Sequence, residues 1–401
     1  MRDVFVGGVG MTAFGKFPDR TMGALAVEAT NSALSDAGLG FPDVETVFFA
    51  NATAGLMTGQ EMVRGQIALR ETGLLGIPFV NVENACASGS TAAHLAWLAV
   101  ASGQVDVALA VGAEKLSHPD KSRSFAAISA AVDQERLEEL KAELYGKDAD
   151  PAATGDRSFF MDVYADMAKK YMARSGATAT DFAGVAVKSH RHAALNPRAQ
   201  YRNPVTLEQV LESRQVSGPL TLLMCSPVGD GAASIVFCSD EVASRLQTPK
   251  VRLRASVLVS GREGPSAETA AERAAKKAYE IAGLGPQDID VAEVHDAAAP
   301  AELIIYEELG LCAPGDGPKL LASGDTTLGG RVPVNTSGGL ISKGHPVGAT
   351  GCAQLVELTE QLRGTLGDRQ VEGARVALAE NGGGYLGPDP AAVCVTILSR
   401  D

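Results

Sequence analysis

The chain has 401 residues, of which 45% are hydrophobic and 21% are charged, and its formal net charge is −13. This composition is typical of a globular protein with two or three domains of about 100–200 residues each, and it excludes a disordered chain. The acidic balance excludes a nucleic-acid surface, no stretch of about 18 apolar residues predicts a membrane span, and six cysteines without regular spacing favour free thiols in a reducing cytoplasm.

The N-terminal part of the chain alternates predicted strands and helices. The pattern predicts a strand at residues 2–9, an amphipathic helix at 21–37, a strand at 44–51 and a helix at 60–72. A GxGxxA pattern begins at Gly8, but the Phe-Gly-Lys-Phe-Pro stretch that follows cannot open the helix of a dinucleotide site. We therefore expect no such site there.

A cysteine follows the next predicted strand. Residues 77–82 predict a buried strand and residues 90–100 a helix, and Cys86 lies between them within Asn-Ala-Cys-Ala-Ser-Gly. Unpaired N–H groups and the dipole at a helix start favour a thiolate, so Cys86 is a candidate nucleophile. A buried structural cysteine is the alternative, because a nucleophile also needs a base and orienting partners.

The chain contains an internal repeat. Ala-Leu-Ser-Asp-Ala-Gly-Leu-Gly at residues 33–40 corresponds to Ala-Tyr-Glu-Ile-Ala-Gly-Leu-Gly at 278–285, and Val-Ala-Leu-Ala at 107–110 corresponds to the same letters at 376–379. Two copies of a strand–helix–strand–helix–strand unit predict a duplicated α/β fold with mixed sheets covered by helices.

The repeat divides the chain into two halves. We expect an N-terminal half of residues 1–250, which carries an inserted loop or cap domain at 115–215, and a C-terminal half of residues 251–401. One clear helix is predicted inside the insertion, at residues 161–175. Duplication places four residues at equivalent strand ends or helix starts, where ligands bind in such folds: Cys86, His295, His345 and Glu380.

Four further motifs carry a family resemblance. They are His-Asp-Ala-Ala-Ala at 295–299, Gly-His-Pro-Val-Gly-Ala-Thr-Gly at 344–351, Glu-Asn-Gly-Gly-Gly at 380–384 and Cys-Ser-Pro-Val-Gly-Asp-Gly-Ala-Ala at 225–233. With the Cys86 segment, they make the chain resemble the thiolase superfamily over essentially its whole length, in particular the sterol-carrier-protein-x type and acetyl-CoA acetyltransferase-like proteins. The resemblance implies a duplicated five-layer α-β-α-β-α fold with an inserted loop domain.

The resemblance also implies roles for individual residues. Cys86 would attack a coenzyme A thioester and hold the acyl group, and His345 would deprotonate it. His295 would polarise the thioester oxygen of the second substrate and so stabilise an enolate. The N–H groups of Cys86 and Gly382 would form an oxyanion hole. Coenzyme A is then a co-substrate, and no permanently bound cofactor is expected.

The sequence departs from the family at the second acid/base. Thiolases usually place a second cysteine at one of two positions, which are Ala297 and Glu380 here. We expect Glu380 to take this role, because burial in an apolar pocket raises a carboxyl pKa toward neutrality. Alternatively, Glu380 only accepts hydrogen bonds from its loop, and His295 or Cys352 moves the α-proton.

Other polar residues carry weaker expectations. The densest basic stretch either binds coenzyme A phosphates or forms a solvated face, and it comprises Lys188, Arg191, Arg198 and Arg202. His190 and His192 have metal-ligand spacing, but no third ligand cluster lies nearby in the sequence, so we expect no metal site.

The predicted function is therefore acyl transfer that makes or cleaves a carbon–carbon bond β to a coenzyme A thioester, by thiolysis or Claisen condensation. One alternative is a C-acyltransferase or retro-aldolase that acts with a small OB-fold, zinc-ribbon partner. Another is a non-catalytic acyl-CoA or lipid binder, which would need neither a nucleophile nor its base. The resemblance implies a homodimer or tetramer, and we expect a cytoplasmic protein.

Overall fold

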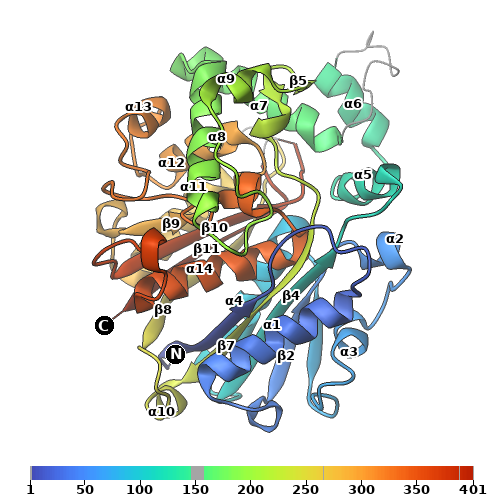
Figure 1. The fold of residues 1–401 in the computed structure, drawn as a ribbon, viewed down its shortest axis with the longest axis vertical. Coiled ribbons are helices and arrows are strands. Elements are labelled where there is room, and N and C mark those ends of the chain that lie inside the picture. The colour runs from blue at the N-terminus through green and yellow to red at the C-terminus, as the bar shows by residue number, and fades with distance from the viewer. Residues whose placement is uncertain (1, 146–157, 265, 388, 401) are drawn as a thin grey trace.

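A nine-stranded sheet forms the centre of the computed structural model, which describes residues 2–145, 158–264, 266–387 and 389–400 (Figure 1). Its strand order is β3-β2-β4-β7-β1-β8-β11-β10-β9. The strands are β1 (Val4–Met11), β2 (Thr46–Ala50), β3 (Phe79–Val82), β4 (Val107–Lys115), β7 (Asp230–Ser239), β8 (Val251–Ser260), β9 (Val291–Glu293), β10 (Val376–Gly383) and β11 (Ala392–Arg400).

The sheet consists of two parts that meet at β1 and β8. Two residue pairs join these strands, Phe5 with Arg252 and Val6 with Val251. In each part a parallel pair lies beside antiparallel strands: β2 with β4 in one, β9 with β10 in the other. The two parts coincide with the predicted halves; as a division into domains, the boundary at residue 250 remains a prediction.

Helices form three layers around the two parts. Helix α1 (Met22–Ala37) covers β1, β7 and β4 on one outer face, and α11 (Ala270–Ala282) covers β8 and β11 on the other. Between the two parts, α4 (Ser88–Ala101) and α14 (Thr350–Arg363) pack against each other and against strands of both (Figure 1). All but one residue of α14 are buried, as a central layer requires. This arrangement confirms the five-layer α-β-α-β-α fold.

Equivalent helices in the two halves begin and end alike. Thr21 accepts a hydrogen bond from a first-turn N–H of α1, and Thr269 does the same for α11. Each helix ends at a glycine with a left-handed φ of 67°, Gly38 or Gly283. These glycines come from the repeated Ala-Gly-Leu-Gly segments, so the repeat seen in the sequence corresponds to matching structural units.

The inserted segment packs over one end of the sheet (Figure 1). Its longest helix, α7 (Phe159–Ser175), confirms the helix predicted at residues 161–175. The prediction missed its other elements, which are α5 (Lys121–Ser129), α6 (Leu137–Tyr145), α8 (Ala179–Ala194), α9 (Leu207–Glu212) and the small sheet of β5 (Gln215–Ser217) and β6 (Leu220–Thr221). Three further α-helices are α10 (Asp240–Ala243), α12 (Ala299–Glu308) and α13 (Gly317–Ala322).

Two local predictions were wrong. Residues 60–72 do not form one helix; α2 (Ala54–Thr58) ends at Gly59, and the short α3 (Arg64–Ala68) starts after Val63, whose φ of 47° is left-handed. The strand before Cys86 is not buried, because β3 pairs on one side with β2 and leaves its other edge open, with Val80 41% exposed. None of the helices in the described ranges is long and apolar enough to cross a membrane.

Candidate active site

A cavity of about 620 Å³ lies at the carboxyl ends of strands from both halves. Cys86 sits in a short turn between β3 and α4, and His295 follows β9. His345 precedes α14, and Gly382 lies near the end of β10. The predicted site residues from two distant parts of the sequence therefore line one cavity, as the duplicated fold requires.

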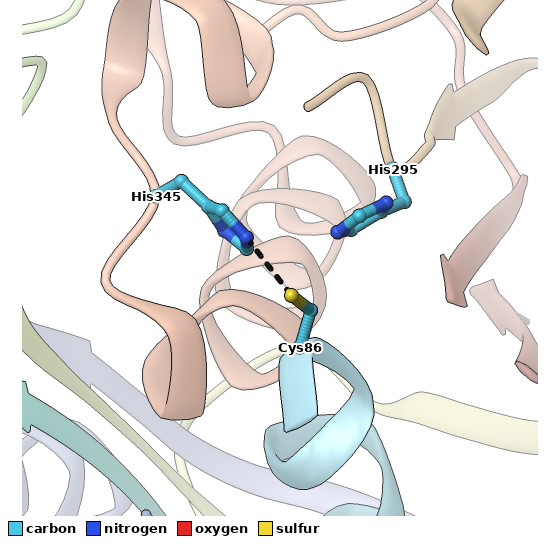
Figure 2. A group of neighbouring side chains, drawn as sticks. All are labelled: Cys86, His295 and His345. Carbon is cyan, nitrogen blue, oxygen red and sulfur yellow. Dashed lines mark hydrogen bonds between the residues drawn. The ribbon is translucent and has the colours of Figure 1, made fainter. Parts of the chain in front are cut away.

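Cys86 and His345 form a close pair (Figure 2). The sulfur of Cys86 lies 3.2 Å from Nε2 of His345, and Nδ1 of His345 lies 2.7 Å from the hydroxyl of Thr350. That hydroxyl donates its proton to the carbonyl oxygen of Pro346, so it accepts the Nδ1 proton of His345. The lone pair of Nε2 therefore faces the thiol, which is the arrangement of a general base beside a nucleophile.

The electrostatics keep this pair neutral at rest. Burial, helped by the nearby charge of Glu114, raises the pKa of the Cys86 thiol to about 12, although the N–H groups of Cys86 and Gly384 act to lower it. Burial holds the pKa of His345 well below its usual value, and the charge of Lys343, like that of a protonated His295, acts in the same direction. The expectation of a resting thiolate was therefore wrong, because desolvation outweighs the helix end.

His295 lines the cavity, and Glu380 lies directly beside it but does not reach the cavity lining. The His295 ring is 5.2 Å from that of His345, centre to centre, and its Nε2 has no hydrogen-bond partner in the described part of the chain. Burial lowers the pKa of His295 to about 4, so this imidazole is neutral. The backbone N–H of His295 donates to Oε2 of Glu380 at 3.0 Å, and burial raises the pKa of Glu380 to about 7.

The glycines after Glu380 fit closely against the Cys86 turn. A Cβ on Gly383 would lie 2.3 Å from the carbonyl oxygen of Asn84, and one on Gly382 would lie 3.6 Å from Oε1 of Glu380. The N–H of Gly384 interacts with the sulfur of Cys86. Sequence reasoning missed Gly384, although its Gly-Gly-Gly run was the available signal.

The predicted phosphate-binding stretch does not reach the cavity. Lys188 is 3% exposed and pairs with Glu302 at 2.6 Å, while Arg198 forms an ion pair with Glu360. The prediction that Lys188 and Arg198 bind phosphate was wrong, because carboxylates of the protein already neutralise both cations. Arg191 and Arg202 are exposed but lie outside the cavity lining. The basic side chains that line the cavity are Lys16, Arg64, His118, Lys121 and Arg214, none of which the sequence singled out.

Two other expectations concern groups away from the cavity. Cys352 is fully buried and donates to the carbonyl oxygen of Gly89 at 3.3 Å, so it is no candidate for the α-proton. His192 uses both ring nitrogens, on the carbonyl oxygen of Asn335 and the N–H of Leu328, which is a structural role.

Comparison with known proteins agrees with this geometry. Residues 4–241 match the thiolase N-terminal domain, and residues 256–400 match the thiolase C-terminal domain-like family. An acetyl-CoA acetyltransferase of Methanothermobacter thermautotrophicus is 40% identical to this chain, and the match covers 100% of both proteins. The benzoylsuccinyl-CoA thiolase subunit BbsB of Thauera aromatica is 37% identical over 96% of this chain and 95% of that protein.

Solved structures show the same relationship. The Ltp2-ChsH2(DUF35) aldolase has a TM-score of 0.80 at 28% identity and covers 100% of this chain and 98% of its own. Acetyl-CoA acetyltransferase from Syntrophomonas wolfei shares the fold, with a TM-score of 0.70 at 18% identity and 100% coverage of both chains. With both family models matched in chain order, this protein belongs to the thiolase family.

Proposed function

We propose that this thiolase-family acyltransferase makes or cleaves the carbon–carbon bond β to a coenzyme A thioester through an acyl-Cys86 intermediate. The observation that carries the proposal is the 3.2 Å contact between the Cys86 thiol and the unprotonated Nε2 of His345. A binding protein would need neither group, so this contact argues against a non-catalytic acyl-CoA or lipid binder.

The first half-reaction loads the acyl group onto Cys86. His345 takes the thiol proton as the sulfur attacks the thioester carbonyl, and coenzyme A leaves as a thiol after receiving that proton. The N–H groups of Cys86 and Gly382 would hold the oxyanion, and such donors contribute about 3–4 kcal/mol each in other acyl transferases. Gly384 is a further candidate donor, because its N–H already interacts with the sulfur.

The second half-reaction needs a base for the α-carbon of the other acyl group. Two observations support Glu380: it lies beside His295 and Gly382, which both line the cavity, and its pKa of about 7 suits proton transfer near neutral pH. The unpartnered Nε2 of His295 is suited to donate to the enolate oxygen. The hydrogen bond from the His295 N–H to Glu380 also fits the alternative, in which Glu380 only orders its loop.

The direct test loads the purified protein with a panel of acyl-CoA esters and measures the intact mass. A covalent adduct that is absent from Cys86→Ala supports the acyl-enzyme, and the ester that loads best identifies the substrate class. If no ester loads wild-type protein, the acyl-Cys86 proposal is wrong.

A small partner subunit is a second, separate proposal. The aldolase in the comparison was solved with a DUF35 protein, and we propose that a small OB-fold partner of that kind binds this chain and raises its activity. The Cys86–His345 pair favours acyl transfer over retro-aldol cleavage, which needs no nucleophilic thiol. The test purifies the tagged chain from its own cells and identifies any small subunit that copurifies. Acyl transfer and retro-aldol cleavage are then assayed with and without that subunit.

The open edge of β3 supports the proposed homodimer or tetramer. Unpaired backbone groups along β3 can pair with a second copy, and apolar side chains are exposed around it: Met62, Val63, Ile67 and Val80. Light scattering during gel filtration measures the mass. All six cysteines are free, which fits the proposed cytoplasmic location.

A further inference from the structure

Three metal-ligating side chains converge at the Cys86 end of the cavity. The sulfur of Cys86 and ring nitrogens of His295 and His345 all lie within 4.8 Å of one another, and Figure 2 shows both imidazoles beside the sulfur. This is the one such group of three found in the described ranges. We propose that these residues form a binding site for zinc or a similar divalent cation, and that the bound cation blocks acyl transfer.

The separations are close to those of a tetrahedral zinc site. Zinc bonds of about 2.3 Å to sulfur and 2.0–2.1 Å to nitrogen place neighbouring ligand atoms about 3.3–3.6 Å apart. The Cys86–His345 distance of 3.2 Å is already close to this value. The widest separation, at most 4.8 Å, needs a shift of about 1 Å, and Nε2 of His295 has no hydrogen bond that would oppose it.

The hydrogen bonds around the cluster suit a metal. Thr350 holds the proton of His345 on Nδ1, which leaves the Nε2 lone pair free to bind a cation. His295 is 7% exposed, and its unpartnered Nε2 is a buried polar atom that lacks a ligand. The substrate oxygen would also use this nitrogen, so a metal and the substrate compete for it.

Charge and ligand type favour a cation of the zinc class. The negative charges of Glu83 and Glu114 act on Cys86 and disfavour a free thiolate. The same negative charges attract a divalent cation to a position beside the sulfur. The positive charge of Lys343 lowers the pKa of His345, and it disfavours a cation beside that ring. One thiolate and two imidazoles suit zinc rather than magnesium or calcium, which prefer oxygen ligands. The fourth position faces the cavity, where water can fill it.

Binding changes no oxidation state. The thiol of Cys86 loses its proton to solvent, and a sulfur–zinc bond forms. The sulfur lone pair and the Nε2 lone pair of His345 are then both occupied, so neither nucleophile nor base remains. The inhibitory part of this inference rests on the proposed function, whereas the metal site itself does not.

Cobalt(II) provides a direct readout of the site. Metal-free protein titrated with cobalt should show a thiolate-to-cobalt charge-transfer band and intense tetrahedral visible bands at one equivalent, and zinc should displace the cobalt. Cys86→Ala should abolish the charge-transfer band, and His295→Ala should weaken zinc binding at least about tenfold by calorimetry. Cys225→Ala is the matched control, because Cys225 is another thiol that lines the same cavity, and it should bind cobalt like wild type.

The outcomes separate the metal site from the proposed function. Circular dichroism checks that each variant folds. If Cys86→Ala does not fold, wild-type protein whose Cys86 has been acylated takes its place, and it should show no cobalt charge-transfer band. A cobalt band that persists in Cys86→Ala, or no band in wild type, overturns the site. Acyl loading with no cobalt band overturns the site alone. A Cys86-dependent band with no loading by any ester leaves the site standing and removes its inhibitory role.

Discussion

Glu380 and His295 are joined by one hydrogen bond, from the backbone N–H of His295 to Oε2 of Glu380 at 3.0 Å. The bond follows from topology: β9 and β10 run parallel, with Glu293 opposite Ala379, so the residues just beyond these positions meet at the same edge of the sheet. The two groups that we assign to the carbon–carbon step are thus held together by the backbone.

Glu380→Gln tests the assignment of the base. Glutamine can still accept the His295 N–H, but its amide cannot take a proton from carbon. We expect acyl-Cys86 to form at a normal rate while the carbon–carbon step slows about 10²–10⁴-fold. Intact mass follows the first step, and product formation follows the second.

Glu83→Gln is the control for Glu380→Gln. Glu83 lines the cavity and, like Glu380, accepts a backbone N–H, that of Ala85, so the substitution removes a carboxylate close to the site and keeps a similar hydrogen bond. We expect its carbon–carbon step to stay within about threefold of wild type. If Glu380→Gln turns over normally, Glu380 only orders its loop.

The raised pKa of Glu380 predicts a pH-dependent stability difference. Burial raises this pKa from 4.5 to about 7, so the folded state binds the proton more tightly than the unfolded state does. Wild type therefore loses stability as pH rises from 4.5 through 7, by about 3 kcal/mol at most. Glu380→Gln lacks this loss, and we expect it to be more stable than wild type at pH 8 but not at pH 5.

Thermal unfolding of both proteins at these two pH values measures the effect. Folding also lowers the pKa values of His295 and His345, so both proteins lose stability as pH falls below about 6.5, and this contribution cancels in the difference. Equal stability at pH 8 would mean that the ionised Glu380 carboxylate is not destabilising.

Thr350 positions His345, and two substitutions separate this role from a structural one. Thr350→Val removes the hydroxyl that holds the Nδ1 proton, so the Nε2 lone pair is no longer fixed toward Cys86. We expect acyl loading to slow about 10²-fold. Thr350→Ser keeps the hydroxyl and should load near the wild-type rate. Slow loading by both variants, with equal loss of melting temperature, would show that packing of Thr350 is what matters.

The sequence predicted those parts of the fold and site that depend on local pattern. Repeated helix ends at Gly38 and Gly283 and the motifs around Cys86 and His345 are local, and the structure confirms the duplication they indicate. The protonation of Cys86 was missed, because burial by distant segments outweighs the local helix dipole.

The cation-binding prediction failed for a related reason. Lys188 looked free in a basic stretch, but its partner Glu302 is more than one hundred residues away in the chain. The cations that do line the cavity come from loops and helix starts spread along the chain, so no single basic stretch marks them in the sequence. Lys16 and Arg214, for example, line the same cavity only because the fold brings their distant segments together.

Adjacent glycines should tolerate alanine differently. Gly383→Ala places a Cβ 2.3 Å from the carbonyl oxygen of Asn84, so the Cys86 turn must move. We expect a loss of about 1–3 kcal/mol in stability and a large loss of acyl loading. Gly382→Ala meets nothing closer than 3.6 Å and should leave the melting temperature nearly unchanged. Equal melting temperatures for the two variants would show that the turn adapts without cost.

The buried pair of Lys188 and Glu302 should support stability and not coenzyme A binding. Their charged atoms are 2.6 Å apart, and Lys188 also donates to the carbonyl oxygen of Val334 at 2.9 Å. Lys188→Met leaves Glu302 buried without its cation, and we expect the free energy of unfolding to fall by about 3–5 kcal/mol. The KM for the acyl-CoA, measured on the folded fraction, should not change. Lys121→Gln, at the cavity, should raise that KM with little effect on stability. If Lys188→Met has a raised KM and the melting temperature of wild type, then Lys188 binds substrate and does not support stability.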